Sequence, residues 1–237
     1  DLRMSRGLGD VYKRQVFNTK PADQTCKGME LIINDSIDHG FITQKEVLRL
    51  LNSKKLSPIG KKMGDINTRL LEDELSKHPL IENVECYRTP GRKIGIEVTQ
   101  RLPLLRVMAA NGDNYYIDSK GKVMPIPNSS AHVAVVTGSV DRDFATKELY
   151  KLGIFLQNHP LWEAQIEQIN VTPAKELELV PRVGEHIIFL GKPGDYEEKF
   201  ERLKIFYKKG LNQVGWNKYS RISLEFSNQI ICTKKEK

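Results

Sequence analysis

The sequence has few cysteines, no clustered histidines and no long apolar run. Its three cysteines, Cys26, Cys86 and Cys232, lie far apart, so neither a CxxC metal site nor a dense disulfide framework is predicted, and any pairing among them stays open. The five histidines never take the HxxxH or HExxH spacing that a helical zinc site requires. No apolar run approaches the length of about 18 residues that a membrane-spanning helix needs.

Motifs of catalysis are missing as well. The sequence has no GxSxG elbow, and Gly60–Gly64 lacks the GxxxxGK[ST] order of a phosphate-binding loop. His39 lies beside Asp35 and Asp38, but the Asn, Asp, Ser and Gly residues around it are typical of a turn between a strand and a helix. No catalytic, cofactor-binding or metal-binding residue is predicted. A non-enzymatic binding protein is therefore favoured over an enzyme.

Net charge gives only weak support to a nucleic-acid partner. The chain carries 37 basic and 30 acidic residues, a net charge of +7. Residues 1–15 hold four basic and two acidic side chains, and without their +2 the remainder carries +5. Asp10–Gln15 resembles translated sequencing-adapter DNA, so residues 1–15 are predicted to be non-native. Residues 16–25, which are polar and contain Pro21, are predicted to be a linker.

Four aromatic side chains bear on the same question. Tyr115, Tyr116, Trp162 and Trp216 could interleave with lysines on an RNA-binding surface. They sit in or beside alternating strand-like segments, however, which favours a place in the core. A nucleic-acid binder therefore stays as an alternative to a protein-binding module.

The first half of the chain predicts a small α+β unit. Met29–Ile33 is a short apolar strand, and Ile81–Arg88 and Lys93–Gln100 are two strands joined by a turn. Between them, Thr43 and Glu46 form a capping box, and Asn67 caps a second helix. Residues 26–103 thus read strand, helix, helix, strand, strand, with both helices on one face of the sheet.

The second half, residues 104–237, predicts a mainly antiparallel β domain with at least two helices. The helices are expected at Asp143–Asn158, with Pro160 just past its end, and at Tyr196–Lys209, with Asp195 as cap and Gly210 as stop. The alternating or short apolar segments predicted as strands are Leu104–Met108, Asn114–Ile117, Lys122–Ile126, His132–Val136, Gln165–Val171, Glu176–Val180 and His186–Leu190.

The final stretch, Lys218–Cys232, predicts one long strand. Ile222, Leu224, Phe226 and Ile230 share one parity, the period of two of a strand with one buried face. No proline or glycine interrupts it, and only a charged run follows, so its free edge is expected to stay uncovered. Such an edge offers unpaired N–H and C=O groups that another chain can extend. The alternative is a terminal strand paired within its own sheet and without a partner.

Several stretches together resemble a known family. They are Met29–Asp35 leading through Gly40 and Phe41 to the capped helix, Gly64–Asn67, His78–Pro103, Asp118–Val123 and Ile222–Phe226. Residues 26–103 resemble a POTRA domain, and the chain from about Phe17 onward resembles the FtsQ/DivIB family of bacterial cell-division proteins, most closely its Bacteroidetes-type members. The resemblance implies the predicted α+β fold, a POTRA domain followed by a β domain.

The resemblance also implies a function, a location and partners. A family member is a non-enzymatic divisome scaffold with a cytoplasmic tail, one inner-membrane helix and a periplasmic remainder at the division septum, where it helps to regulate septal peptidoglycan synthesis. The tail and helix are expected upstream of this sequence, which makes residues 16–25 a juxtamembrane linker. The implied partners are FtsB/DivIC and FtsL homologues, with FtsB/DivIC adding a strand to the last strand of the β domain. No cofactor is implied.

The partner-binding residues expected in that strand are Ile222, Leu224, Phe226, Asn228, Gln229 and Ile230. Phe226 matches the family's aromatic and is expected to be the anchor. Asn228 and Gln229 replace a smaller, glycine-containing step, so the partner's fit differs there. Besides a nucleic-acid binder, a POTRA-bearing outer-membrane assembly or secretion factor is an alternative. A single POTRA unit without barrel-like strands of about ten residues counts against that alternative.

Overall fold

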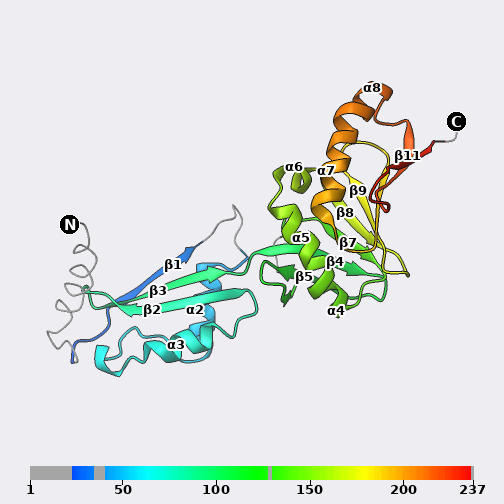
Figure 1. Cartoon of the computed structure of the whole chain (residues 1–237). Coiled ribbons are helices and arrows are strands. Elements are labelled where there is room, and N and C mark those ends of the chain that lie inside the picture. The colour runs from blue at the N-terminus through cyan, green and yellow to red at the C-terminus, as the bar shows by residue number, and fades with distance from the viewer. Residues whose placement is uncertain (1–22, 35–40, 128–129, 236–237) are drawn as a thin grey trace, which may run out of the picture. The chain divides into compact units, whose positions relative to one another are not determined.

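The computed structural model describes residues 23–34, 41–127 and 130–235, which form two compact units with a border between Arg101 and Leu102 (Figure 1). The predicted non-native segment, most of the predicted linker and the cluster of His39 with Asp35 and Asp38 lie outside the described residues. Within the described part of the chain, no helix is long and apolar enough to cross a membrane.

The first unit has the predicted order of strand, helix, helix, strand, strand. In its three-stranded sheet β3 is central, parallel to β1 on one side and antiparallel to β2 on the other. The elements are β1 (Gly28–Asn34), α2 (Gln44–Ser53), the short 3-10 turn η1 (Met63–Asp65), α3 (Thr68–Leu75), β2 (Ile81–Arg88) and β3 (Lys93–Gln100).

Both helices of the first unit begin where the caps were predicted. Thr43 and Glu46 form the complete capping box at α2, and the Asn67 side chain accepts a hydrogen bond from the Leu70 N–H at α3. Val47 and Leu51 of α2 and Leu71 and Leu75 of α3 are buried in one cluster with the inward side chains of β3. The sheet face that carries Ile94, Ile96 and Val98 is therefore the face that the helices cover.

The second unit is built on a nine-stranded sheet of order β12-β11-β10-β9-β8-β7-β4-β5-β6. The β4–β7, β7–β8 and β10–β11 pairs are parallel and the other five are antiparallel, so the sheet is mixed, and the predicted α+β fold class is confirmed. Its strands are β4 (Pro103–Ala109), β5 (Asn114–Asp118), β6 (Val123–Met124), β7 (Val135–Gly138), β8 (Ile166–Val171), β9 (Leu177–Pro181), β10 (Ile187–Gly191), β11 (Tyr219–Ser223) and β12 (Ile231–Lys234).

The first predicted helix of this unit has nearly the expected bounds, whereas the last one runs further than predicted. Pro160 lies just past the helical run that ends at Gln157, as predicted, and it also opens a further helix, a position where its missing N–H costs nothing. Gly210 does not stop the last helical run, which continues to Val214 and ends at Gly215, whose φ is +95°. The segments are α4 (Arg142–Phe144), η2 (Ala145–Leu149), α5 (Tyr150–Gln157), α6 (Pro160–Gln165), α7 (Tyr196–Phe206), η3 (Tyr207–Leu211) and α8 (Asn212–Val214).

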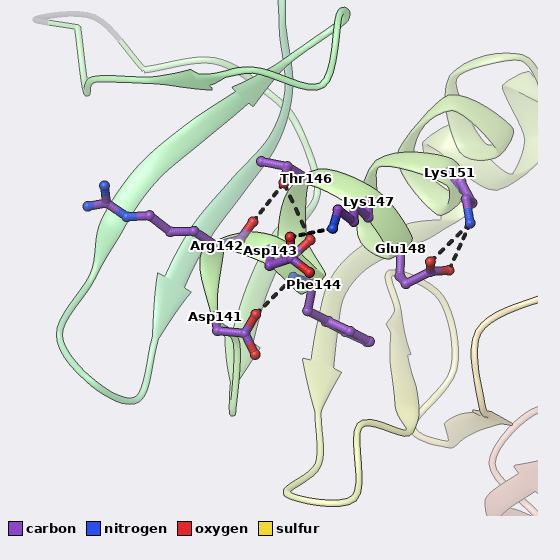
Figure 2. A network of polar contacts seen from close by, with 8 residues as sticks. All are labelled: Asp141, Arg142, Asp143, Phe144, Thr146, Lys147, Glu148 and Lys151. Carbon is purple, nitrogen blue, oxygen red and sulfur yellow. Dashed lines mark hydrogen bonds and ion pairs between the residues drawn. The ribbon is translucent and has the colours of Figure 1, made fainter.

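Charged side chains fix the start of the run from α4 to α5, as Figure 2 shows. The Asp141 carboxylate accepts a hydrogen bond of 2.8 Å from the Phe144 N–H, and Lys147 lies 2.6 Å from Asp143 one turn away. Lys175, in the turn between β8 and β9, reaches the same Asp141 carboxylate at 2.6 Å and lowers its pKa. This helix start is therefore tied to the end of the neighbouring strand pair.

Candidate partner-binding edge

The end of the chain is a hairpin rather than one long strand. β11 ends at Ser223, residues 224–230 cross over, and β12 returns antiparallel with Ser223 opposite Ile231. The prediction of a single strand over Lys218–Cys232 is therefore wrong. The alternating pattern continues through the crossover, but Ser227 and Asn228 are turn formers, and this was the signal that could have located the turn.

The free edge of the sheet lies one strand further along the chain than predicted. β11 is parallel to β10 on one side and is covered by β12 on the other, so the expectation that nothing later covers it is wrong. Among the described strands, β12 has β11 as its single neighbour and forms one edge of the nine-stranded sheet. Figure 1 shows this hairpin in red at the C-terminal end.

The register shows which backbone groups of β12 face outward. The Leu224 N–H donates to the Phe189 carbonyl on β10, so Arg221 and Ser223, of opposite parity, face β12. Across the hairpin the Lys235 N–H donates to the Lys218 carbonyl. Because strand groups alternate, Ile231 and Thr233 pair with β11, whereas the N–H and C=O groups of Cys232 and Lys234 point away from it.

The six residues predicted for the partner site fall into two groups. Ile222 and Leu224 are fully buried in the core of the second unit and their backbone N–H groups face β10, so they can act only by supporting the sheet. The other four lie in the crossover, where Phe226 is 48 % exposed, Asn228 and Gln229 are exposed and Ile230 is partly buried. The sequence analysis missed Cys232 and Lys234 because it placed the partner-binding edge at Ile222–Ile230 rather than at β12.

A shallow groove of about 450 Å³ lies between the last helical run and the crossover. Its floor and walls come from Arg202, Ile205 and Phe206 of α7, from Lys209 and Gly210 of η3, and from residues 227–230. Ile205 is 47 % exposed and gives the groove an accessible apolar side chain. The hairpin thus presents an apolar hollow next to an open strand edge.

The aromatic residues considered for nucleic-acid binding do not form a surface. Tyr115, Tyr116 and Trp162 are all at least 96 % buried, and Trp216 packs against Tyr207 at a ring separation of 4.8 Å. This removes the aromatic support for the nucleic-acid alternative. Among the residues that the structure describes, no group of three or more His, Cys, Asp or Glu side chains is placed to hold a metal ion.

A buried histidine supports the segment that leads into the hairpin. His186 is 1 % exposed, and its Nε2 lies 2.8 Å from the Tyr207 hydroxyl. Its ring also faces Trp216, three residues before β11, at 6.4 Å. Burial lowers the pKa of His186 below its ordinary value of 6.5, because the cluster offers little solvation to a charged imidazolium.

The second unit should therefore lose stability in acid through His186. The unfolded chain takes up a proton near the ordinary pKa of 6.5, whereas the folded chain resists it, so the stabilisation is present above that pH and lost as pH falls below it. Between about pH 7.5 and 5.5, the midpoint of thermal unfolding should fall further in the parent chain than in His186→Gln. Equal falls in the two proteins would show that His186 is not responsible.

Comparison with known proteins places this fold and this edge in a family. The family model described as FtsQ/DivIB, C-terminal related, matches residues 102–233, more than half of the chain, and a POTRA-like domain model matches residues 24–99. The chain belongs to the FtsQ/DivIB family. The resemblance inferred from the sequence is thereby confirmed, as is the POTRA identity of the first unit, and nearly all of β12 lies within the matched residues.

Three curated relatives in this family are each named cell division protein FtsQ. The one from Geotalea daltonii is 25 % identical over 187 residues, covering 74 % of this chain and 66 % of the relative. The one from Rhodothermus marinus is 25 % identical over 196 residues, covering 73 % and 67 %, and the one from Myxococcus fulvus is 27 % identical over 171 residues, covering 67 % and 57 %. The matched part thus spans about two thirds or less of each FtsQ relative.

Proposed function

We propose that this chain is a non-enzymatic scaffold of the bacterial division machinery, which binds other division proteins by adding a partner strand to β12. The observation that carries the proposal is the outward-facing backbone of Cys232 and Lys234 on the edge of the sheet. Strand addition requires such unpaired N–H and C=O groups and little else from the receiving strand. Membership of the FtsQ/DivIB family and the names of the relatives support a role in cell division.

The partners we propose are the periplasmic segments of FtsB/DivIC and FtsL homologues. In this account a helix upstream of the printed sequence holds the chain in the inner membrane, and both units lie in the periplasm at the division septum. Binding there helps to regulate septal peptidoglycan synthesis. These statements rest on the family resemblance, and no nucleic-acid partner is proposed.

The backbone of β12 and the apolar surface beside it contribute differently to binding. The backbone of β12 supplies hydrogen bonds that do not depend on the partner's sequence. The groove, which Ile205 of α7 lines, and the exposed Phe226 and Ile231 of the hairpin supply apolar contact area that selects the partner. Lys218 and Lys234 border the same hairpin, whereas Lys235 already pairs with Glu185, and the two lysines favour a partner strand flanked by acidic residues.

Phe226→Ala is expected to weaken binding of the FtsB/DivIC segment by about tenfold or more. Exposed aromatic anchors commonly contribute about 2 kcal/mol or more at protein interfaces, and each 1.4 kcal/mol is about a factor of ten in Kd. The ring is half exposed in the free chain, so its removal should cost the fold little. The measurement is a titration of residues 16–237 with the partner segments, read by calorimetry.

Leu161→Ala is the matched control, since Leu161 is 53 % exposed on α6, outside the hairpin and its groove. It should bind like the parent chain. Binding that survives in Phe226→Ala would move the anchor elsewhere on the two units. If the parent chain itself binds none of the segments, the proposed function is wrong.

A further inference from the structure

We propose that Arg202 of α7 is a positioning residue for β12, holding the crossover so that Cys232 and Lys234 present their backbone groups to the partner strand. The inference rests on the proposed function of β12. Arg202 Nη2 donates to the Leu224 carbonyl at 3.2 Å, and Nη1 donates to the Phe226 carbonyl and, at 3.3 Å, to that of Gln229. One guanidinium therefore binds the beginning, the middle and the end of the segment that joins β11 to β12.

The guanidinium is itself held in place. The Arg202 side chain is only 19 % exposed, and its Nε lies 3.7 Å from the Glu198 carboxylate one turn earlier on α7. On the same helix the buried Lys199 donates to the carbonyls of Leu190 and Lys192, at 2.9 Å and 3.1 Å. Lys199 thus holds α7 against the end of β10, and the hydrogen bonds of Arg202 hold the crossover against α7.

The register of β12 needs such support. The strand has four residues, its pairing with β11 contains an irregularity between Tyr219 and Arg221, and no strand in the described part of the chain pairs with its other side. A slip of one residue would turn Ile231 and Thr233 outward and Cys232 and Lys234 inward, because groups alternate along a strand. The position of the Gln229 carbonyl, two residues before β12, limits where the strand can begin.

The chemistry of the contact favours arginine over lysine. The three carbonyls come from different points along a seven-residue segment, and a guanidinium offers donors on a rigid planar fork that can address them together. A lysine ammonium offers its protons from a single point. Replacement by lysine therefore keeps the charge but loses part of the contact.

The test uses amide hydrogen exchange in the whole chain without any partner. Arg202→Gln is expected to speed exchange at the Ile231 and Thr233 amides, which face β11, by about tenfold or more, because hydrogen bonds to a charged donor are lost. Exchange at Ile169 of β8 and Leu179 of β9, in the middle of the sheet, should stay as in the parent chain. In Arg202→Lys, the exchange rates at Ile231 and Thr233 should fall between those of the parent chain and those of Arg202→Gln.

Lys204→Gln is the matched control, because it removes a positive charge from the same helix at a residue that pairs with Glu201 rather than with the crossover. It should leave exchange at β12 unchanged. Unchanged β12 exchange in Arg202→Gln would overturn the proposal, since Arg202 would then not hold β12 in place. An equal rise in exchange at Ile169 and Leu179 would also overturn it, since Arg202 would then stabilise the whole unit rather than β12.

A second arm measures binding of the FtsB/DivIC segment to the same proteins. Arg202→Gln should weaken it by about tenfold and Lys204→Gln should not. Faster exchange at β12 with unchanged affinity would overturn the positioning role. If the parent chain does not bind the segment, the proposed function fails, while the exchange arm still decides whether Arg202 holds β12 in register.

Discussion

Cys232→Pro is expected to weaken binding of the partner strand by about tenfold to a hundredfold while leaving the fold intact. The Cys232 N–H points away from β11, so proline removes a donor that the free protein does not use. In the complex the same change leaves a partner carbonyl without its hydrogen bond and places a ring against it. An unsatisfied group of this kind costs roughly 1–3 kcal/mol.

Cys232→Ala is the matched control, because it loses the same thiol but keeps the N–H. The Cys232 side chain packs against the core cluster of the second unit, so both variants share any cost of losing that contact. The titration should show near-parental affinity for alanine and a large loss for proline. Equal affinities in the two variants would mean that the partner does not pair with β12.

Gly138→Ala is expected to lower the free energy of unfolding of the second unit by about 2–5 kcal/mol. Gly138 ends β7 with φ of +91°, a conformation that costs an L-residue roughly 1–2 kcal/mol. An added Cβ would also collide with the Val171 carbonyl of β8 and lie 2.7 Å from Asn170 Oδ1. β7 is parallel to β8 at this point, so relief of the collision must push apart two central strands, at a further cost of about 1–3 kcal/mol.

Gly112→Ala separates the two contributions. Gly112 has the same φ of +91°, but no atom lies within 4 Å of its would-be Cβ. Gly112→Ala should therefore lower the free energy of unfolding by about 1–2 kcal/mol, the conformational cost alone. Chemical denaturation measures the free energy of unfolding of both variants. Similar decreases would mean that β7 and β8 can accommodate the added Cβ at residue 138 without strain.

How well the sequence predicted structure depended on whether the signal was local. Thr43, Glu46 and Asn67 lie next to the helices they cap, and their side chains bond to N–H groups three residues away, so the caps could be read directly. Asp195 shows the limit of this reasoning. It precedes α7 as predicted, yet it makes no side-chain cap, because its left-handed φ of +52° departs from the extended backbone that a capping residue usually has.

The terminal hairpin could not be predicted from periodicity, because the pattern of apolar residues does not change where the chain leaves the sheet. Leu224 is buried just after β11 ends, and Phe226 continues its parity although it lies in the crossover and is half exposed. What holds the crossover is Arg202, more than 20 residues away along the chain. A contact of this kind depends on tertiary packing, so the local sequence pattern does not predict it.

The most direct test of the central claim is amide hydrogen exchange of residues 16–237, free and saturated with the FtsB/DivIC segment. Strand addition to β12 predicts that the Cys232 and Lys234 amides, which point away from β11, become strongly protected in the complex. Ile231 and Thr233, already paired with β11, should change much less. Saturable binding without new protection at Cys232 and Lys234 would contradict the account, because the partner would then dock on another surface.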